Sequence, residues 1–339
     1  MSSNSAQALA NELKGHLFEF LLAQKISQFY QQEYQFINQI DSATMDRLLD
    51  YQQQIQAYDQ KLFLDLQRWA ELGASYLCRY FPFKPPLLSS KMLGKSEQGA
   101  EADLLFQFMD SVCFLSVKLS KFSAYVNTKS GGAKTFLANY LLPYLEEHDR
   151  LVVTEAQLQV VKISQQHFWE TAYLLHDLRG FEFRHLPEEQ DLFSSWIDQG
   201  APVLPGELSD EEKQILYQYY QRITEYYGNF FQAFFSHKNR DLAAKSWLMN
   251  LLGLSDQHLY QFYFFADTEQ MLLIAANQIK QKLDPKLWKF SFAPNRLSFY
   301  IDFNLGQLQI RPKPMNVFTS PALKINCSVK WDQKALASL

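Results

Sequence analysis

The stretch Glu101-Ala-Asp-Leu-Leu-Phe-Gln-Phe-Met-Asp-Ser-Val-Cys-Phe-Leu-Ser-Val-Lys118 decides the fold class of this chain. Leu104–Phe108 is a short apolar run, residues 109–111 form a break, and Val112–Lys118 is a second run with alternating positions. Two such runs joined by a short turn are typical of adjacent antiparallel strands. Asp103 at the start of the first strand and Lys118 on the second are therefore expected at the same end of a sheet.

Side chains alternate across a strand, so Ser116 and Lys118 are expected on one face and Val117 on the other. A carboxylate such as that of Asp103 suits Mg²⁺, which prefers few carboxylates together with waters and phosphate oxygens. A lysine beside the ion can orient a water molecule and offset the charge that develops on a phosphate. The pattern therefore predicts phosphodiester hydrolysis. A surface salt bridge is the competing interpretation.

The residues before this stretch follow a helical pattern. Apolar positions recur at helical spacing through the first 80 residues, and a second helix is expected from about Ser42, with Ser42 or Thr44 as its N-cap. Pro82 follows the end of this helical pattern. Residues 87–99 are polar and rich in lysine, which predicts an exposed loop.

The residues after this stretch are expected to form more helices and then strands. The expected elements are a third strand at 122–126, a helix at 135–145, helices from 154 with capping boxes at Thr154–Gln157 and Ser209–Glu212, a loop at 198–207, a hairpin of 297–303 with 307–311, and a last strand at 323–329.

Composition limits the class of protein. The chain has 339 residues, of which 47% are hydrophobic and 15% aromatic, so it can bury a large core that includes most of the aromatic side chains. No apolar run approaches the roughly 18 to 20 residues that span a bilayer, and the N-terminus has no signal-peptide pattern. Three widely separated cysteines exclude a disulfide framework, so a cytoplasmic protein with no membrane partner is expected.

The net charge of −4 is the sum of unlike regions. Residues 280–334 hold ten basic and three acidic side chains, a local charge of +7, and residues 84–134 hold seven and four, a charge of +3. The remaining chain therefore carries −14. Basic residues on a hairpin suit contact with a nucleic acid, although a solvated cationic face without a partner is the alternative.

Sequence motifs in three places resemble type II restriction endonucleases of the PD-(D/E)XK nuclease superfamily. Asp103 followed by Ser116-Val-Lys118 is similar to the motif in which an acid, a second acid and a lysine line one end of a sheet. Gly15-His-Leu-Phe-Glu19 resembles the Gly-x-x-Phe-Glu signature of many such enzymes. Leu308-Gln-Ile-Arg-Pro-Lys and Ser320-Pro-Ala-Leu-Lys-Ile resemble their terminal strands, and the likeness is loosely to the group that cuts GGCC.

The resemblance implies Mg²⁺-dependent, site-specific cleavage of double-stranded DNA by a homodimer that restricts foreign DNA. Asp103 would bind the metal and Lys118 would position the attacking water. Ser116 stands where the motif has a second acid, and a hydroxyl is a poor Mg²⁺ ligand. Either Glu19 or Glu101 supplies the missing carboxylate, or the metal is held by Asp103 and the backbone carbonyl of Val117, with Ser116 as a hydrogen-bonding group.

The residues expected to contact DNA are basic, with one asparagine. A cluster at the start of the 135–145 helix could bind a phosphate through free backbone amides, and the C-terminal hairpin could reach base edges or phosphates. These residues are Lys121, Lys129, Lys134, Arg296, Arg311, Lys313, Asn316 and Lys324.

The expected fold is α/β, with a restriction-endonuclease-like mixed sheet flanked by helices, a large helical elaboration and a C-terminal β-hairpin region. Residues 1–150 would hold the nuclease core, 151–255 the helical elaboration, and 256–339 the β-rich region that contacts DNA. The alternative is a non-catalytic helical protein that binds nucleic acid or protein. In that case the Asp103 and Lys118 side chains would face opposite sides of the sheet.

Overall fold

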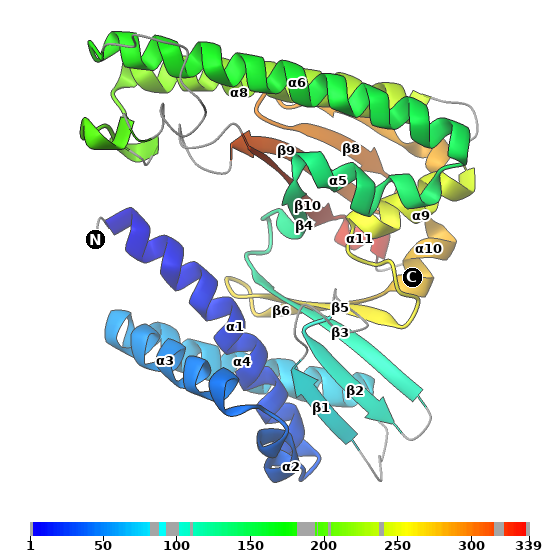
Figure 1. Cartoon of the computed structure of the whole chain (residues 1–339). Helices are drawn as coiled ribbons and strands as arrows, with labels where there is room; N and C mark the ends of the chain where they lie inside the picture. Colours follow the sequence, from blue (N-terminus) through cyan, green and yellow to red (C-terminus); the bar gives the residue numbers. More distant parts are fainter. Residues whose placement is uncertain are drawn as a thin grey trace. The chain divides into compact units, whose positions relative to one another are not determined.

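The computed structural model describes residues 3–81, 88–92, 102–108, 111–181, 194, 196–202, 205–236, 241–314 and 322–336. The chain divides into two compact units (Figure 1). Unit 1 comprises Met1–Ala124 and Leu254–Gln281, and unit 2 comprises Tyr125–Gly253 and Lys282–Leu339. This division differs from the three consecutive regions expected from the sequence, because each unit combines two segments that are far apart in the chain.

Unit 1 begins with helices, as the apolar period predicts. They are α1 (Ser3–Phe29), α2 (Glu33–Asn38), α3 (Ser42–Tyr58) and α4 (Gln60–Tyr80). The N-cap of α3 is Asp41 rather than the expected Ser42 or Thr44, since the Asp41 carboxylate accepts a hydrogen bond of 2.9 Å from the Thr44 amide. Helix α4 ends before Pro82, where a helix break was expected.

The sheet of unit 1 is mixed. Its strands, in spatial order, are β1 (Leu88–Met92), β2 (Leu104–Phe108), β3 (Ser111–Ser120), β5 (Leu259–Phe265) and β6 (Gln270–Ala275), and α10 (Ala276–Lys282) follows. The β2–β3 hairpin is antiparallel, as predicted, and β3 pairs in parallel with β5. The prediction of a loop at 87–99 was wrong for β1. Serine and lysine suit an edge strand, which β1 is.

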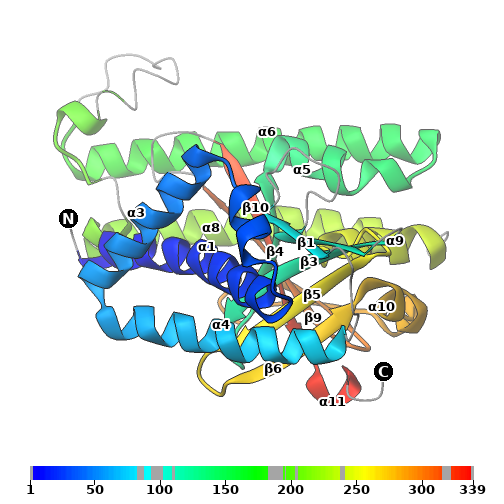
Figure 2. The same cartoon turned by 90° about the horizontal axis from the view of Figure 1, so that it is seen from below.

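One face of this sheet carries the core of unit 1. Figure 2 shows α1, α3 and α4 on one side of the strands, and the buried side chains of Leu66, Val117 and Phe262 belong to one apolar cluster there. Phe18 of α1 packs against Phe264 with ring centroids 5.7 Å apart. Burying a phenylalanine contributes about 1.5–3 kcal/mol. Phe18 of α1 is therefore in the core, as its helical spacing predicts, whereas Phe29 and Tyr34, which follow the same pattern, are exposed.

Unit 2 begins with a strand and continues mostly with helices. Its first elements are β4 (Val126–Gly132), α5 (Ala133–Tyr140), η1 (Leu142–Tyr144), α6 (Glu147–Leu178), η2 (Pro205–Glu207), α8 (Asp210–Ser236) and α9 (Asp241–Leu251). The strand expected at 122–126 was wrong, because residues 122–125 form a turn and β4 begins at Val126. The helix expected at 135–145 begins two residues earlier and ends at Tyr140.

The two predicted capping boxes have different outcomes. The box at Ser209 is confirmed, since the Glu212 amide donates to Ser209 Oγ at 3.2 Å and the Ser209 amide donates to Glu212 Oε2 at 2.7 Å. The box at Thr154 was wrong, because α6 already begins at Glu147. Gln157 is buried in that helix, and its amide donates to the carbonyl of Ala133 at 2.9 Å. The same residue spacing therefore occurs inside a helix with another role.

The sheet of unit 2 is antiparallel throughout. In spatial order it contains β4, β10 (Leu323–Trp331), β9 (Gly306–Pro314), β8 (Phe299–Phe303) and β7 (Lys289–Phe292), with η3 (Pro285–Leu287) before β7 and α11 (Gln333–Leu336) after β10. The predicted β8–β9 hairpin and the last strand are confirmed. Helix α8 packs on the apolar face, where the rings of Phe231 and Phe299 are 5.4 Å apart.

Candidate active site

The β2–β3 hairpin places Asp103 beside the centre of β3. The Asp103 amide donates to the Leu115 carbonyl at 2.9 Å, which continues the hairpin by one residue beyond β2. Asp103 Oδ2 accepts hydrogen bonds from the Val117 amide at 2.6 Å and from Ser116 Oγ at 3.1 Å. Lys118 Nζ lies 3.8 Å from the same oxygen. Residues at the two ends of the predicted motif therefore meet at one carboxylate.

Strand alternation explains this convergence. Val117 is buried in the apolar cluster under the helices, so its two neighbours, Ser116 and Lys118, project to the opposite face. Ser116 is only 2% exposed and its hydroxyl is bonded to Asp103, whereas the side chains of Asp103 and Lys118 are 25% and 23% exposed. The carboxylate of Asp103 and the ammonium group of Lys118 are thus partly accessible. The buried Ser116 hydroxyl stabilises the carboxylate by donating a hydrogen bond to it.

Helix α1 brings a second acid to this end of the unit. Leu17, Phe18 and Leu21 of α1 are buried in the unit 1 core, and Glu19 lies between them with a side chain that is 17% exposed. His16 Nδ1 is 3.5 Å from Glu19 Oε2, and the His16 ring stacks on Tyr51 at 6.1 Å. The helix packing therefore fixes the position of Glu19 through its apolar neighbours.

The electrostatics of Glu19 link it to the hairpin. Burial raises the pKa of Glu19 above its ordinary value, and the charge of Asp103 raises this pKa further. A hydrogen bond and charge from His16, and the charge of Lys118, act in the opposite direction. Two carboxylates that repel each other in a partly buried site favour a bound cation, because a cation removes both the repulsion and part of the burial cost.

The ligand set for a metal is small. Within the described residues no group of three or more histidine, cysteine, aspartate or glutamate side chains is arranged to hold a metal ion. Glu101, one of the expected ligands, lies outside the described residues. The carboxylates of Asp103 and Glu19 fit a hard divalent cation such as Mg²⁺, which takes only one or two protein carboxylates and completes its shell with water and phosphate oxygens.

The residues expected to contact DNA are divided between the units. Lys121 follows β3 in unit 1, where burial and then the charge of Lys121 lower the pKa of Lys14. Lys129 and Lys134 are in unit 2, on β4 and α5. The Lys129 ammonium group lies 5.1 Å from the centre of the Tyr140 ring, so it covers an aromatic side chain.

The C-terminal candidates also differ in their surroundings. Arg296 adopts a positive φ of 54° in the β7–β8 connection, and its guanidinium lies 3.9 Å from the Glu225 carboxylate. Arg311, Lys313 and Lys324 lie on paired strands of the unit 2 sheet. Asn316 lies outside the described residues. The described C-terminal candidates therefore lie on different elements of unit 2.

Sequence reasoning missed two side chains next to the site. Gln261 of β5 is buried, lies in register with Ser116, and accepts a hydrogen bond of 2.7 Å from the Tyr263 hydroxyl. Tyr51 of α3 stacks on His16. A glutamine within the otherwise apolar Leu259–Phe265 run was a usable signal for the first. No local signal indicates Tyr51, because the contact depends on how α1 and α3 pack.

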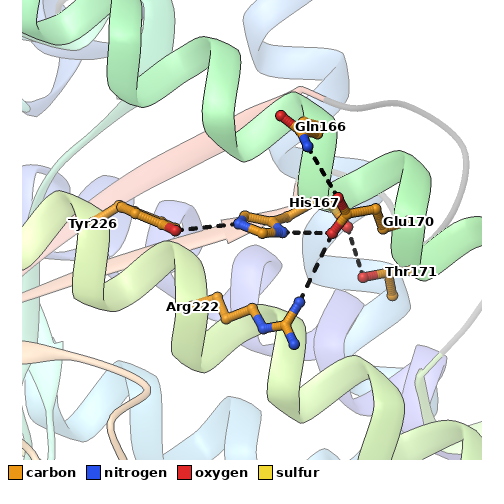
Figure 3. Close-up of polar contacts among 6 residues, drawn as sticks. All are labelled: Gln166, His167, Glu170, Thr171, Arg222 and Tyr226. Carbon is orange, nitrogen blue, oxygen red and sulfur yellow. Dashed lines mark hydrogen bonds and ion pairs between the residues drawn. The ribbon is translucent and has the colours of Figure 1, made fainter.

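A second polar cluster joins α6 to α8 in unit 2 (Figure 3). Glu170 accepts from His167 Nδ1 at 2.7 Å, and His167 Nε2 lies 3.3 Å from the Tyr226 hydroxyl. The hydrogen bond from His167 lowers the pKa of Glu170, with smaller contributions from Gln166 and Arg222. Glu170 is 46% exposed, so the cluster links the two helices at their surface.

Comparisons with known proteins give no relative: no protein-family model, curated protein or solved structure matches this chain. In the described part of the chain, no helix is long and apolar enough to cross a membrane.

Proposed function

We propose that this chain is a Mg²⁺-dependent endonuclease that hydrolyses phosphodiester bonds in double-stranded DNA, as type II restriction enzymes do. The observation that carries the proposal is the meeting of Lys118 and Asp103, 3.8 Å apart on one side of the β2–β3 hairpin. Glu19 adds a second carboxylate within electrostatic range of both. The mixed sheet, with an antiparallel hairpin and a parallel β3–β5 pair flanked by helices, supports the resemblance to the PD-(D/E)XK nucleases.

Each side chain has a distinct role in this proposal. Asp103 and Glu19 would hold the metal, and Ser116 and the Val117 amide would keep the Asp103 carboxylate in one orientation. The Lys118 ammonium group would orient the attacking water and stabilise the negative charge that grows on the phosphate. When bound, Mg²⁺ would polarise the phosphate and lower the pKa of a coordinated water. Ser116 is therefore a positioning residue, and Glu19 fills the second acidic role.

Plasmid cleavage tests this proposal. Purified protein with Mg²⁺ should convert plasmid DNA to discrete fragments, and Asp103→Ala should leave the plasmid intact. Asp46→Asn is a matched control, since Asp46 is an exposed acid on α3 of the same unit. Plasmid that stays intact with wild-type protein in both Mg²⁺ and Mn²⁺ would refute the proposal.

The biological setting belongs to the same proposal. Discrete fragments would mean recognition of a sequence, and a homodimer would cut both strands of a site. A cytoplasmic enzyme of this kind restricts foreign DNA, and the host must then protect its own sites. A neighbouring gene for a DNA methyltransferase would support this setting.

A non-catalytic binding protein is the alternative, and α6 favours it. This helix carries large apolar side chains at exposed positions, including Leu151 at 70% and Leu158 at 63% exposure. They are seven residues apart and lie near one face of the helix. An exposed apolar stripe on a long helix suits contact with another protein. Absence of cleavage, combined with loss of a protein partner in a Leu151→Ser and Leu158→Ser double variant, would favour this alternative.

A further inference from the structure

The face of the unit 2 sheet opposite its apolar side carries cationic side chains on two neighbouring strands, β9 and β10. Burial alternates along β9 and β10, with Ile310 and Ile325 buried on the apolar face. The side chains between them project to the other face. Arg311 lies opposite Asn326 and Lys313 lies opposite Lys324 in the β9–β10 register. We call Arg311, Lys313 and Lys324 the cationic strip.

The strip contains an unfavourable pair. Lys313 and Lys324 are directly opposed on antiparallel strands, an arrangement in which like charges destabilise a sheet. Burial lowers the pKa of Lys313, and the charges of Arg311 and Lys324 lower it further, so the three cations act on one another. An anion bound next to these lysines would offset the repulsion between them.

No carboxylate in the described structure pairs with the strip. Its three members form no ion pair among the described residues, and the sequence from Phe303 to Trp331 contains neither aspartate nor glutamate. Asp302 of β8 lies on the same face of the sheet as the strip. It accepts a hydrogen bond from the Gln307 side chain, which is near the start of β9, whereas Arg311 and Lys313 are near its end. The repulsion within the strip is therefore not offset by a neighbouring acid of the described sheet.

Hydrogen-bonding groups border the strip. Asn326 of β10 pairs with Arg311 of β9 on one side and with Ser130 of β4 on the other. The Ser130 hydroxyl donates a hydrogen bond of 2.6 Å to the side-chain oxygen of Asn326. The Asn326 amide nitrogen is on the same side chain, next to Arg311. Cations flanked by amide and hydroxyl groups are the side chains that contact phosphate and sugar in protein–DNA interfaces.

We propose that the cationic strip, together with Asn326 and Ser130, binds the sugar-phosphate backbone of duplex DNA. Arg311 and Lys313 are two positions apart on a strand, or about 6.6 Å, and Lys324 is their cross-strand neighbour. Duplex DNA carries a charge about every 1.7 Å along its axis, so several phosphates can meet this dense group of cations. The inference rests on the proposed function only for the choice of DNA as the polyanion.

Lys129 and Arg296 are not part of this surface. Lys129 covers Tyr140, and Arg296 lies near Glu225. The strip therefore consists of three of the predicted DNA contacts, which lie on adjacent strands. Backbone contacts of this kind fix the position of a protein on DNA but do not read sequence. Base recognition must involve other residues.

The test measures binding without cleavage. The full-length chain is titrated into a fluorescein-labelled random duplex in EDTA, and anisotropy is recorded from about 50 to 200 mM salt. A Lys313→Gln and Lys324→Gln double variant is compared with Lys162→Gln and Lys286→Gln, a control that removes two exposed lysines of the same unit. Far-UV circular dichroism and thermal unfolding establish that both variants are folded.

The strip variant should bind about tenfold or more weakly at low salt, with the slope of log K against log salt reduced by about 2, because two phosphate contacts are lost. The control should match wild type. Equal affinity and slope for the two variants would overturn the proposal, as would wild-type protein that does not bind DNA at low salt. Binding that depends on the strip without any cleavage in Mg²⁺ would refute the nuclease proposal and leave this one standing.

Discussion

The two sheets of this protein differ in how they arrange charged side chains. In unit 1 the hairpin brings an acid and a lysine to one point, and a backbone amide and a hydroxyl fix the carboxylate. In unit 2 paired strands place two lysines opposite each other with an arginine beside them. A neutralised, oriented pair suits chemistry at one atom, whereas uncompensated like charges suit an extended polyanion. Under the proposed function, the first arrangement is the site for catalysis and the second is a surface for binding DNA.

The largest expected effect is on the cleavage rate, and it distinguishes the catalytic role of Lys118 from the binding role of Lys324. Lys118→Gln should lower the single-turnover cleavage rate about 10²–10³-fold at saturating DNA, because it removes charge stabilisation of the transition state. Lys324→Gln should weaken DNA binding and leave that rate unchanged. Quench-flow or gel assays with excess enzyme measure both. Equal rate losses in the two variants would end the distinction between site and surface.

The pH dependence of stability should be set partly in unit 2. Burial lowers the pKa of His176 from 6.5 to about 4, and the side chain packs against Trp196 with ring centroids 4.7 Å apart. Between these values the unfolded chain binds a proton that the folded chain does not, so folding stability rises with pH across this window. The full effect is up to about 3 kcal/mol.

Urea unfolding of wild type and His176→Phe from pH 4 to pH 6.5 measures this contribution. The variant should show a flatter dependence on pH than wild type. Parallel curves for the two proteins would mean that His176 does not contribute in this way. Cleavage activity near neutral pH should be the same in both, since His176 lies in α6 of unit 2.

Two glycines should respond in opposite directions to alanine. A Cβ at Gly228 of α8 would lie 2.3 Å from the Phe292 ring, so Gly228→Ala should destabilise the protein by about 1–3 kcal/mol through overpacking. A Cβ at Gly15 of α1 meets no atom within 4 Å, so Gly15→Ala should stabilise it by up to about 1 kcal/mol through helix propensity. Thermal unfolding compares the two. Destabilisation by Gly15→Ala would mean that this part of α1 is constrained by more than packing.

The smallest expected effect concerns the support of Asp103. Ser116→Ala removes one of the hydrogen bonds to Asp103 Oδ2 and leaves the bond from the Val117 amide. Loss of such a bond costs about 1 kcal/mol, so cleavage should slow several-fold with DNA affinity unchanged. Ser116→Thr keeps the hydroxyl and should restore part of the rate. A rate loss as large as that of Lys118→Gln would make Ser116 a direct participant.

Local patterns predicted the parts of the fold that depend on neighbouring residues. The β2–β3 hairpin and the β8–β9 hairpin follow from alternation and short turns, and the meeting of Asp103 with Lys118 follows from the first hairpin. The parallel pairing of β3 with β5 joins distant segments, so no local pattern indicates it. The discontinuous units follow from that pairing, and consecutive regions could not anticipate them.

The candidate site shows the same limit. Strand alternation placed Ser116 and Val117 on their faces, but the position of Glu19 depends on how α1 packs against the sheet. Lys129 in unit 2 also depends on packing that no local pattern predicts. The β4–β10 register shifts next to Cys327, and the Lys129 side chain contacts the Tyr140 ring. Sequence identifies charged residues readily. Packing decides which of them remain available for a ligand.

Binding of a divalent cation tests the central claim most directly. Mn²⁺ is titrated into the full-length chain, and the free ion is followed by electron paramagnetic resonance. The carboxylates of Asp103 and Glu19 should bind about one ion per chain, Asp103→Asn should abolish this binding, and Asp46→Asn should leave it unchanged. Wild-type protein that binds no Mn²⁺, or an Asp103→Asn variant that binds it as well as wild type, would contradict the account.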